Sequence, residues 1–296
     1  MTESPALAAS APPRSAAHKK YDFSRKYWVF ALPAVIVVLS VIVFPWLFTV
    51  FMSVHDWKIG GGMDFVGLDN FRTLVFDDRF RESLLITFYF TVLAVVIPIV
   101  LGTLAALVFH REFPFRGILR TIFVMPMMAT PVAVALVWKM MFHPQLGVLN
   151  YLLSLFGIPP SEWVFSTSTV IPTLVMLILL GGLAGMPTEP YESAKIDGAN
   201  SWQMFRFITL PLLWPYIMIA LVIRTIDALK VFDIIFVISE GGPGTASETL
   251  NIFLYLQAFQ FYKLGYSSAV VVIFFTIIVA LSLILLYVRQ KTKWNS

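Results

Sequence analysis

The apolar residues of this chain are concentrated in six long blocks, and this pattern limits the fold more than any other feature of the sequence. A helix needs roughly 20 apolar residues to cross the hydrocarbon layer of a bilayer. Six segments approach or exceed that length, at residues 27–52, 83–109, 117–142, 169–186, 212–238 and 264–288. Only 13% of the residues are charged, whereas a soluble domain carries about 25%. The sequence therefore predicts an all-α, polytopic membrane protein with six transmembrane helices.

The distribution of Lys and Arg predicts the orientation of these helices, because cytoplasmic segments are enriched in basic residues. If the N-terminus is cytoplasmic, thirteen basic residues lie in the four inner segments and five lie in the three outer ones. The inner residues are Arg14, Lys19, Lys20, Arg25, Lys26, Arg111, Arg116, Arg120, Lys195, Arg206, Arg289, Lys291 and Lys293, and the outer ones are Lys58, Arg72, Arg79, Arg81 and Lys263. We therefore expect both termini to be cytoplasmic.

Composition divides the chain into three parts. Residues 1–26 are rich in Ala, Ser and Pro, which predicts a disordered cytoplasmic tail. They do not read as a signal peptide, since the first apolar block starts late, runs too long and has no small-residue cleavage site. Residues 27–288 form the expected transmembrane domain, with a cytoplasmic connection at 187–211, and residues 289–296 form a cytoplasmic tail. The fourth block is the shortest and contains Pro172 near its start.

Several classes of protein are excluded or disfavoured by what the sequence lacks. The chain has no cysteine, so disulfides and thiolate metal sites are impossible. His18, His55, His110 and His143 have no metal-ligand spacing, and we expect no metal and no cofactor. No Gly-x-x-x-x-Gly-Lys-Ser/Thr motif is present, so any ATP has to be handled by a partner. The basic residues flank the apolar blocks rather than forming a patch, which argues against nucleic acid.

The connection between the fourth and fifth blocks is the most informative segment. Its sequence predicts a short helix, a break at Gly198 and a second helix capped by Asn200 or Ser201. Small residues surround the break, so the surface of another protein could approach the backbone closely.

This segment resembles the EAA loop of ABC importer permeases, whose pattern is Glu-Ala-Ala, three residues, Gly, nine residues, Ile, one residue, Leu-Pro. Six positions match at the required spacing, and Ser193 replaces the first Ala; the matching residues are Glu192, Ala194, Gly198, Ile208, Leu210 and Pro211. The resemblance implies that the loop docks on a cytoplasmic ATPase subunit and transmits its closure to the membrane helices. The residues expected to couple are Glu192, Ser193, Ala194, Asp197, Gly198 and Ala199.

Three further segments resemble the carbohydrate-uptake branch of this family, in the half similar to the larger maltose permease and to glycerol-phosphate and sugar permeases. These are Gly67-Leu68-Asp69-Asn70-Phe71, the run from Trp138 through Phe142 and Gly147 to Asn150, and Phe232-Asp233 with Gly241-Gly242-Pro243 and Thr249-Leu250. The fourth block departs from the family because it is shorter and lacks the usual Trp-containing centre. No substrate contact is therefore carried over to it.

The resemblance also implies a location and a set of partners. The chain is expected in the bacterial inner membrane, as a non-catalytic subunit that forms half of a channel. A homologous second permease subunit would complete the channel, and two cytoplasmic ATPase subunits would drive it. A periplasmic or lipid-anchored binding protein would deliver a sugar or sugar-derived solute, whose identity the sequence does not specify.

Four charged residues recur every three positions in the fifth block: Arg224, Asp227, Lys230 and Asp233. Charges inside a membrane normally face the bundle interior or a wet cavity. We expect Arg224, Asp227 and Lys230, with Trp138 packing on sugar faces, to line the solute path. The competing interpretation is two structural ion pairs, Arg224–Asp227 and Lys230–Asp233, with the second pair near the outer surface.

Two other functions compete with an ABC permease. An ion-coupled secondary transporter could use Asp227 or Asp233, but the sequence shows no obvious inverted repeat. An intramembrane enzyme is disfavoured because no His–Asp–Ser or metal constellation recurs across the blocks.

Overall fold

The computed structural model describes residues 28–57, 60–109, 130–182 and 210–291, and these are mostly helical. The chain divides into two compact units, one from Met1 to Leu47 and the other from Phe48 to Ser296.

The described part of the first unit is one run of helix. It comprises α1 (Trp28–Val38), the π-helical turn η1 (Leu39–Val43) and the start of α2 (Phe44–Ser53). Most of its large apolar side chains are exposed, and the stretch Phe30–Ser53 is long and apolar enough to cross a membrane. An all-round apolar helix with exposed side chains is what a lipid environment favours.

The second unit begins with the rest of α2, which leads into a short antiparallel hairpin. The hairpin consists of β1 (His55–Trp57) and β2 (Met63–Phe65), and His55 pairs with Phe65. The helices that follow are α3 (Asp69–Phe76), α4 (Asp78–Phe109), α6 (Pro131–Met141), α7 (Val148–Leu155), α8 (Val170–Gly182), α10 (Leu210–Lys230), α11 (Asp233–Ser239), α12 (Leu250–Tyr255), the π-helical η5 (Leu256–Gln260) and α13 (Leu264–Lys291).

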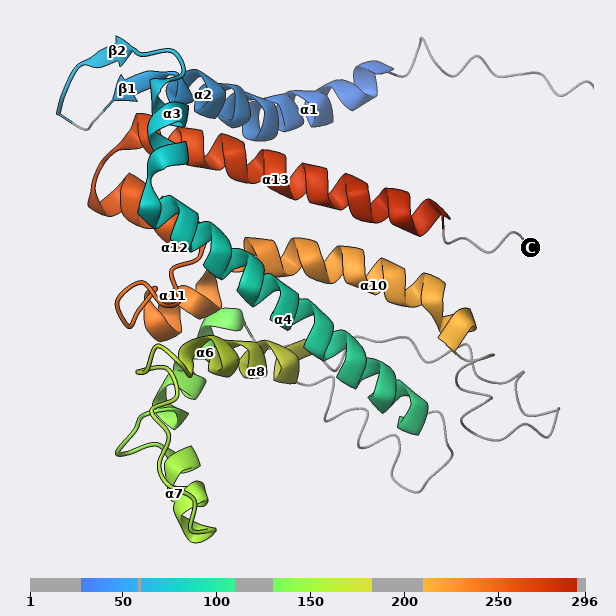
Figure 1. Cartoon of the computed structure of the whole chain (residues 1–296). Coiled ribbons are helices and arrows are strands. Elements are labelled where there is room, and N and C mark those ends of the chain that lie inside the picture. The colour runs from blue at the N-terminus through green and yellow to red at the C-terminus, as the bar shows by residue number, and fades with distance from the viewer. Residues whose placement is uncertain (1–27, 58–59, 110–129, 183–209, 292–296) are drawn as a thin grey trace, which may run out of the picture. The chain divides into compact units, whose positions relative to one another are not determined.

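The long helices of this unit pack in the order α13, α10, α4 and α8 (Figure 1). The short helices fill one end of that row: α11 packs against α6 and α8, and α12 packs against α4 and α13. The largest apolar cluster joins residues from α4, α6, α8 and α11 around Phe90, Phe142 and Leu174. A second cluster, around Leu74, Phe253 and Val270, joins α3, α12 and α13.

Three described helices are long and apolar enough to cross a membrane, within Phe30–Ser53, Asp78–Leu104 and Leu264–Lys291. They correspond to the first, second and sixth apolar blocks. The described helices of the third and fourth blocks, α6 and α8, are shorter. The structure thus agrees with a helical membrane protein.

The fifth block is not one continuous helix, which differs from the expectation for residues 212–238. Helix α10 ends at Lys230, and α11 begins at Asp233. Asn251 stabilises the break, because its side-chain amide donates hydrogen bonds to the carbonyls of Leu229 (2.8 Å) and Val231 (3.2 Å). These bonds satisfy carbonyls that a helix end leaves unpaired.

A glycine allows the hairpin to cross the start of α13. An added Cβ on Gly265 would lie 1.9 Å from the carbonyl oxygen of His55, far closer than non-bonded atoms can approach.

We predict that Gly265→Ala destabilises the protein by about 1–3 kcal/mol, because overpacking displaces backbone that cannot yield easily. Thermal unfolding of the detergent-solubilised protein measures this effect. Gly62→Ala is the matched control, since its Cβ would meet nothing closer than 4.0 Å. Equal melting temperatures for the two variants would contradict the prediction.

Candidate functional site

Helix α10 has one face that the described residues leave exposed. Its other sides pack against α4 and α13. The exposed stripe, which we call the α10 stripe, consists of Tyr216, Ile219, Ile223, Asp227 and Lys230. Their spacing of three or four residues places them on one side of the helix. Two of the expected pathway residues, Asp227 and Lys230, therefore share an open face.

Arg224 lies beside this stripe, at the border with the packed side of α10. Its side chain is half-buried. One guanidinium nitrogen, Nη2, is buried and has no hydrogen-bond partner among the described residues. An unsatisfied buried neutral donor costs about 1–3 kcal/mol, and a charged donor costs more. We therefore expect Arg224 to have a partner outside the described residues.

Neither of the ion pairs considered from the sequence is formed within the described ranges. Arg224 makes no ion pair with Asp227, and the helix break separates Lys230 from Asp233. The role of these four charges, in the solute path or in the structure, stays a prediction.

Trp138 is placed elsewhere, on α6. Its ring centroid lies 5.4 Å from that of Phe142, which lies 5.5 Å from that of Trp163. Between residues 130–182 and 210–291, no hydrogen bond, ion pair or ring contact links Trp138 to Arg224, Asp227 or Lys230. The neighbouring Lys139 donates a 2.8 Å hydrogen bond to the carbonyl of Val237, at the end of α11.

The expected coupling residues Glu192, Ser193, Ala194, Asp197, Gly198 and Ala199 lie outside the described residues. Within the described ranges, no group of three or more His, Asp or Glu side chains could hold a metal ion.

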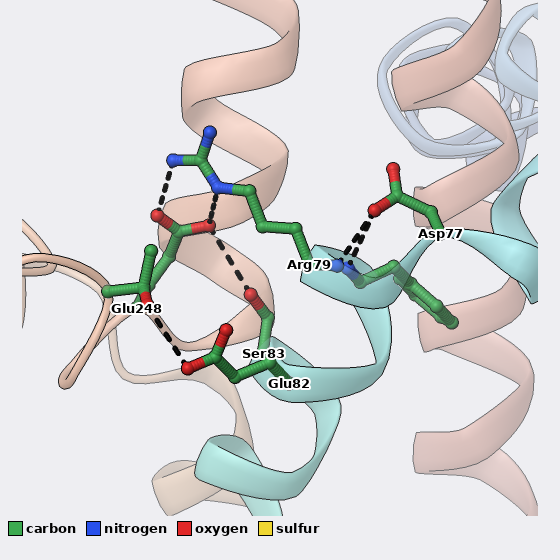
Figure 2. A network of polar contacts seen from close by, with 7 residues as sticks. Asp77, Arg79, Glu82, Ser83 and Glu248 are labelled. Carbon is green, nitrogen blue, oxygen red and sulfur yellow. Dashed lines mark hydrogen bonds and ion pairs between the residues drawn. The ribbon is translucent and has the colours of Figure 1, made fainter.

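A polar network that no sequence pattern signalled lies at one end of α4 (Figure 2). Glu248 is buried, with 2% side-chain exposure, and its carboxylate accepts two hydrogen bonds from Arg79, at 2.8 Å from Nε and 2.6 Å from Nη2. Ser83 donates a further bond of 3.3 Å. Such two-point pairing of a guanidinium with a carboxylate is strong and directional.

The network extends to the neighbouring elements. Asp77 caps α4 by accepting hydrogen bonds from the backbone N–H groups of Arg79 and Phe80. Its other oxygen accepts a 2.6 Å bond from the hydroxyl of Tyr266 on α13. The hydroxyl of Thr245 donates a 3.1 Å hydrogen bond to Glu82. The start of α4 is thereby tied to α13 and to the loop between α11 and α12.

One of the signature segments, Gly67–Phe71, has a structural role at the same end of the molecule. The side-chain amide of Asn70 donates hydrogen bonds of 2.9 Å to the carbonyls of Ser53 and His55, at the end of α2 and the start of β1. Gly67 has a φ of 57°, which L side chains rarely adopt. These residues fix the chain where it leaves a membrane helix.

Residues 98–294 match the family described as "Binding-protein-dependent transport system inner membrane component". A trehalose/maltose transport system permease protein of Thermococcus litoralis is 34% identical over 283 residues, covering 91% of this chain and 95% of that protein. The chain belongs to this family. A protein of Sinorhizobium fredii named as a probable ABC transporter permease is 32% identical over 277 residues, covering 89% of each chain.

The fold is also that of a solved importer. The structure aligns, with a TM-score of 0.77 and 22% identity, with a chain of a bacterial ABC transporter involved in the import of the acidic polysaccharide alginate. The alignment covers 90% of this chain and 95% of the other. This binding-protein-dependent permease is thus a non-catalytic membrane subunit of an ABC importer, in a family whose ATP hydrolysis takes place on separate subunits. Family membership decides against the ion-coupled carrier and the intramembrane enzyme.

We predict that Arg79→Ala destabilises this permease by about 1–3 kcal/mol, because it leaves the Glu248 carboxylate buried without its main donor. Arg81→Ala is the control. Arg81 pairs with Asp78 at 2.6 Å, but both side chains are exposed, and such pairs contribute about 0–1 kcal/mol. Thermal unfolding in detergent compares them. A loss in Arg81→Ala as large as that in Arg79→Ala would contradict this account of the network.

Proposed function

We propose that this permease translocates a sugar or sugar-derived solute as half of the channel of an ABC importer. The observation that carries the proposal is family membership over most of the chain, together with similarity to the trehalose/maltose permease and to the alginate importer. The signature segments around Gly67, Asn70 and Asn150 support the same branch of the family.

The proposed topology has six spans between residues 27 and 288 and both termini in the cytoplasm. Thirteen basic residues against five support this orientation. In this arrangement, residues 1–26 and 289–296 are cytoplasmic tails. The α4 network and the loop between α11 and α12 then lie on the outer side, where solute arrives.

The proposed assembly contains a second, homologous permease subunit, two cytoplasmic ATPase subunits and a periplasmic or lipid-anchored binding protein. The family description supports dependence on a binding protein. The absence of any phosphate-binding loop in the sequence supports separate ATPase subunits.

Within this assembly the loop 187–211 is the proposed ATPase docking site. Gly198→Pro should block the left-handed conformation expected at the break, because the ring of Pro fixes φ at a negative value. Glu192→Lys reverses the charge at the first motif position. Both variants should insert into the membrane, yet lose most ATPase co-purification and ATP-dependent uptake.

Ser193→Ala is the matched control, since it restores the residue that the family pattern has at that position. It should transport normally. Normal uptake by both Gly198→Pro and Glu192→Lys would remove the basis for assigning the docking site to this loop.

The α10 stripe and Arg224 are the proposed wall of the solute path. Asp227 and Lys230 offer hydrogen-bonding charges on an open face, and Arg224 has a buried nitrogen without a described partner. Trp138 remains a candidate for packing against a sugar face, from α6.

We further propose that Arg224 recognises negative charge on the solute. Arg224→Gln should reduce uptake of an anionic sugar derivative about tenfold or more, because a hydrogen bond to a charged group contributes roughly 1.5–3 kcal/mol. Uptake of the neutral analogue should change little. Arg224→Lys keeps the charge and should retain part of the preference. Equal losses for both solutes in Arg224→Gln would show that Arg224 does not distinguish solute charge.

A further inference from the structure

The break between α10 and α11 follows directly after the two charged residues that end the α10 stripe. Asp227 lies about one turn before the end of α10, and Lys230 is its last residue. The chain leaves the helix at Val231 and Phe232, and α11 begins at Asp233. The direction of the charged end of the stripe therefore depends on what holds the last turn of α10.

A single side-chain amide holds this turn. The last four carbonyls of an α-helix have no partner within the helix. Asn251, in the first turn of α12, donates hydrogen bonds from one nitrogen to the carbonyls of Leu229 (2.8 Å) and Val231 (3.2 Å). These two carbonyls flank Lys230 along the chain. Because the backbone is held on both sides of Lys230, the direction of the turn is fixed as well as its position.

The first turn of α12 is itself tied to α4, so that Asn251 connects α10 to a fixed part of the structure. The backbone N–H of Leu250 donates a 2.8 Å hydrogen bond to the hydroxyl of Thr87. Just before α12, the buried carboxylate of Glu248 accepts two bonds from Arg79. The end of α10 is thus anchored through α12 to α4.

The local sequence does not require a break at this point. Val231 and Phe232 are neither Gly nor Pro, and both residue types are found inside helices. A span that only crossed the membrane could continue through them. In many transporters, interrupted helices line the solute site, because irregular backbone within a membrane is tolerated where it is buried in protein or lines a cavity. A break held from outside the helix, directly after two charges, fits such a role.

We propose that Asn251 is a positioning residue of the solute path. It holds the last turn of α10 so that Asp227 and Lys230 meet the solute in a fixed direction. The inference rests on the proposed function, which places the α10 stripe in that path. Charges that are oriented before the solute arrives lose less freedom on binding, so the effect of Asn251 on transport passes through the charges that it orients.

A spin label tests whether Asn251 holds the turn. The chain has no cysteine of its own, so a label on Lys230→Cys in the purified full importer reports on the end of α10 alone. Asn251→Leu removes both hydrogen bonds and should increase the mobility of the label. Gln260→Leu, which removes an exposed amide from η5, is the matched control and should leave the mobility unchanged. Equal mobility with and without Asn251 would overturn the proposal.

A double-mutant cycle tests whether Asn251 acts through Lys230. Uptake of labelled maltose, trehalose and glucuronate is measured in proteoliposomes that contain the full importer, per folded complex. Asn251→Leu should reduce uptake about tenfold, yet have little further effect in Lys230→Gln, because residues that act as one unit are not additive. A merely structural role would lower uptake by the same factor in both backgrounds, which would contradict positioning.

The same uptake measurements separate this inference from the proposed function. A wild-type importer that takes up none of the three sugars would contradict the proposed function. If wild type transports but neither Asp227→Asn nor Lys230→Gln alters uptake, then the proposed solute path fails. If these two variants alter uptake and Asn251→Leu does not, then only the positioning role of Asn251 fails.

Discussion

The carboxylate of Glu248 is buried, and much of one end of the structure is arranged to satisfy it. Arg79 and Ser83 on α4 supply its donors. A buried charge keeps its ionised form only when such partners are in place. Because the partners lie 169 and 165 residues away along the chain, the pair fixes the loop before α12 against the start of α4. The cap at Asp77 and the bond from Tyr266 extend this order to α13.

The main helices could be predicted from the sequence because their cause is local. Long apolar runs specify membrane helices wherever they occur, and the first, second and sixth blocks appear as long apolar helices. The signature residues Gly67 and Asn70 were also visible in advance, although the sequence did not show that Asn70 binds the carbonyls of Ser53 and His55.

The features that were missed depend on partners distant in sequence. Nothing near Val231 signals a helix end, since the apolar pattern continues and neither Gly nor Pro is present. The break is stabilised by Asn251, twenty residues downstream of Val231. The Arg79–Glu248 pair is of the same kind. The coupling residues around Glu192 and Gly198 are still a prediction from motif spacing, because they lie outside the described residues.

The α4 network and the α10 charges differ in a way that bears on function. At the start of α4, the chain provides a guanidinium, a hydroxyl and backbone N–H groups for the carboxylates it carries. On α10, one buried nitrogen of Arg224 has no hydrogen-bond partner among the described residues. Asp227 and Lys230 lie on the exposed face, and within the described ranges neither forms the ion pair expected with Arg224 or Asp233. The same chain can satisfy a buried charge when structure alone requires it. The charges on α10 that the described residues leave unsatisfied are the ones that we propose to line the solute path, because charges within a membrane normally face the bundle interior or a wet cavity.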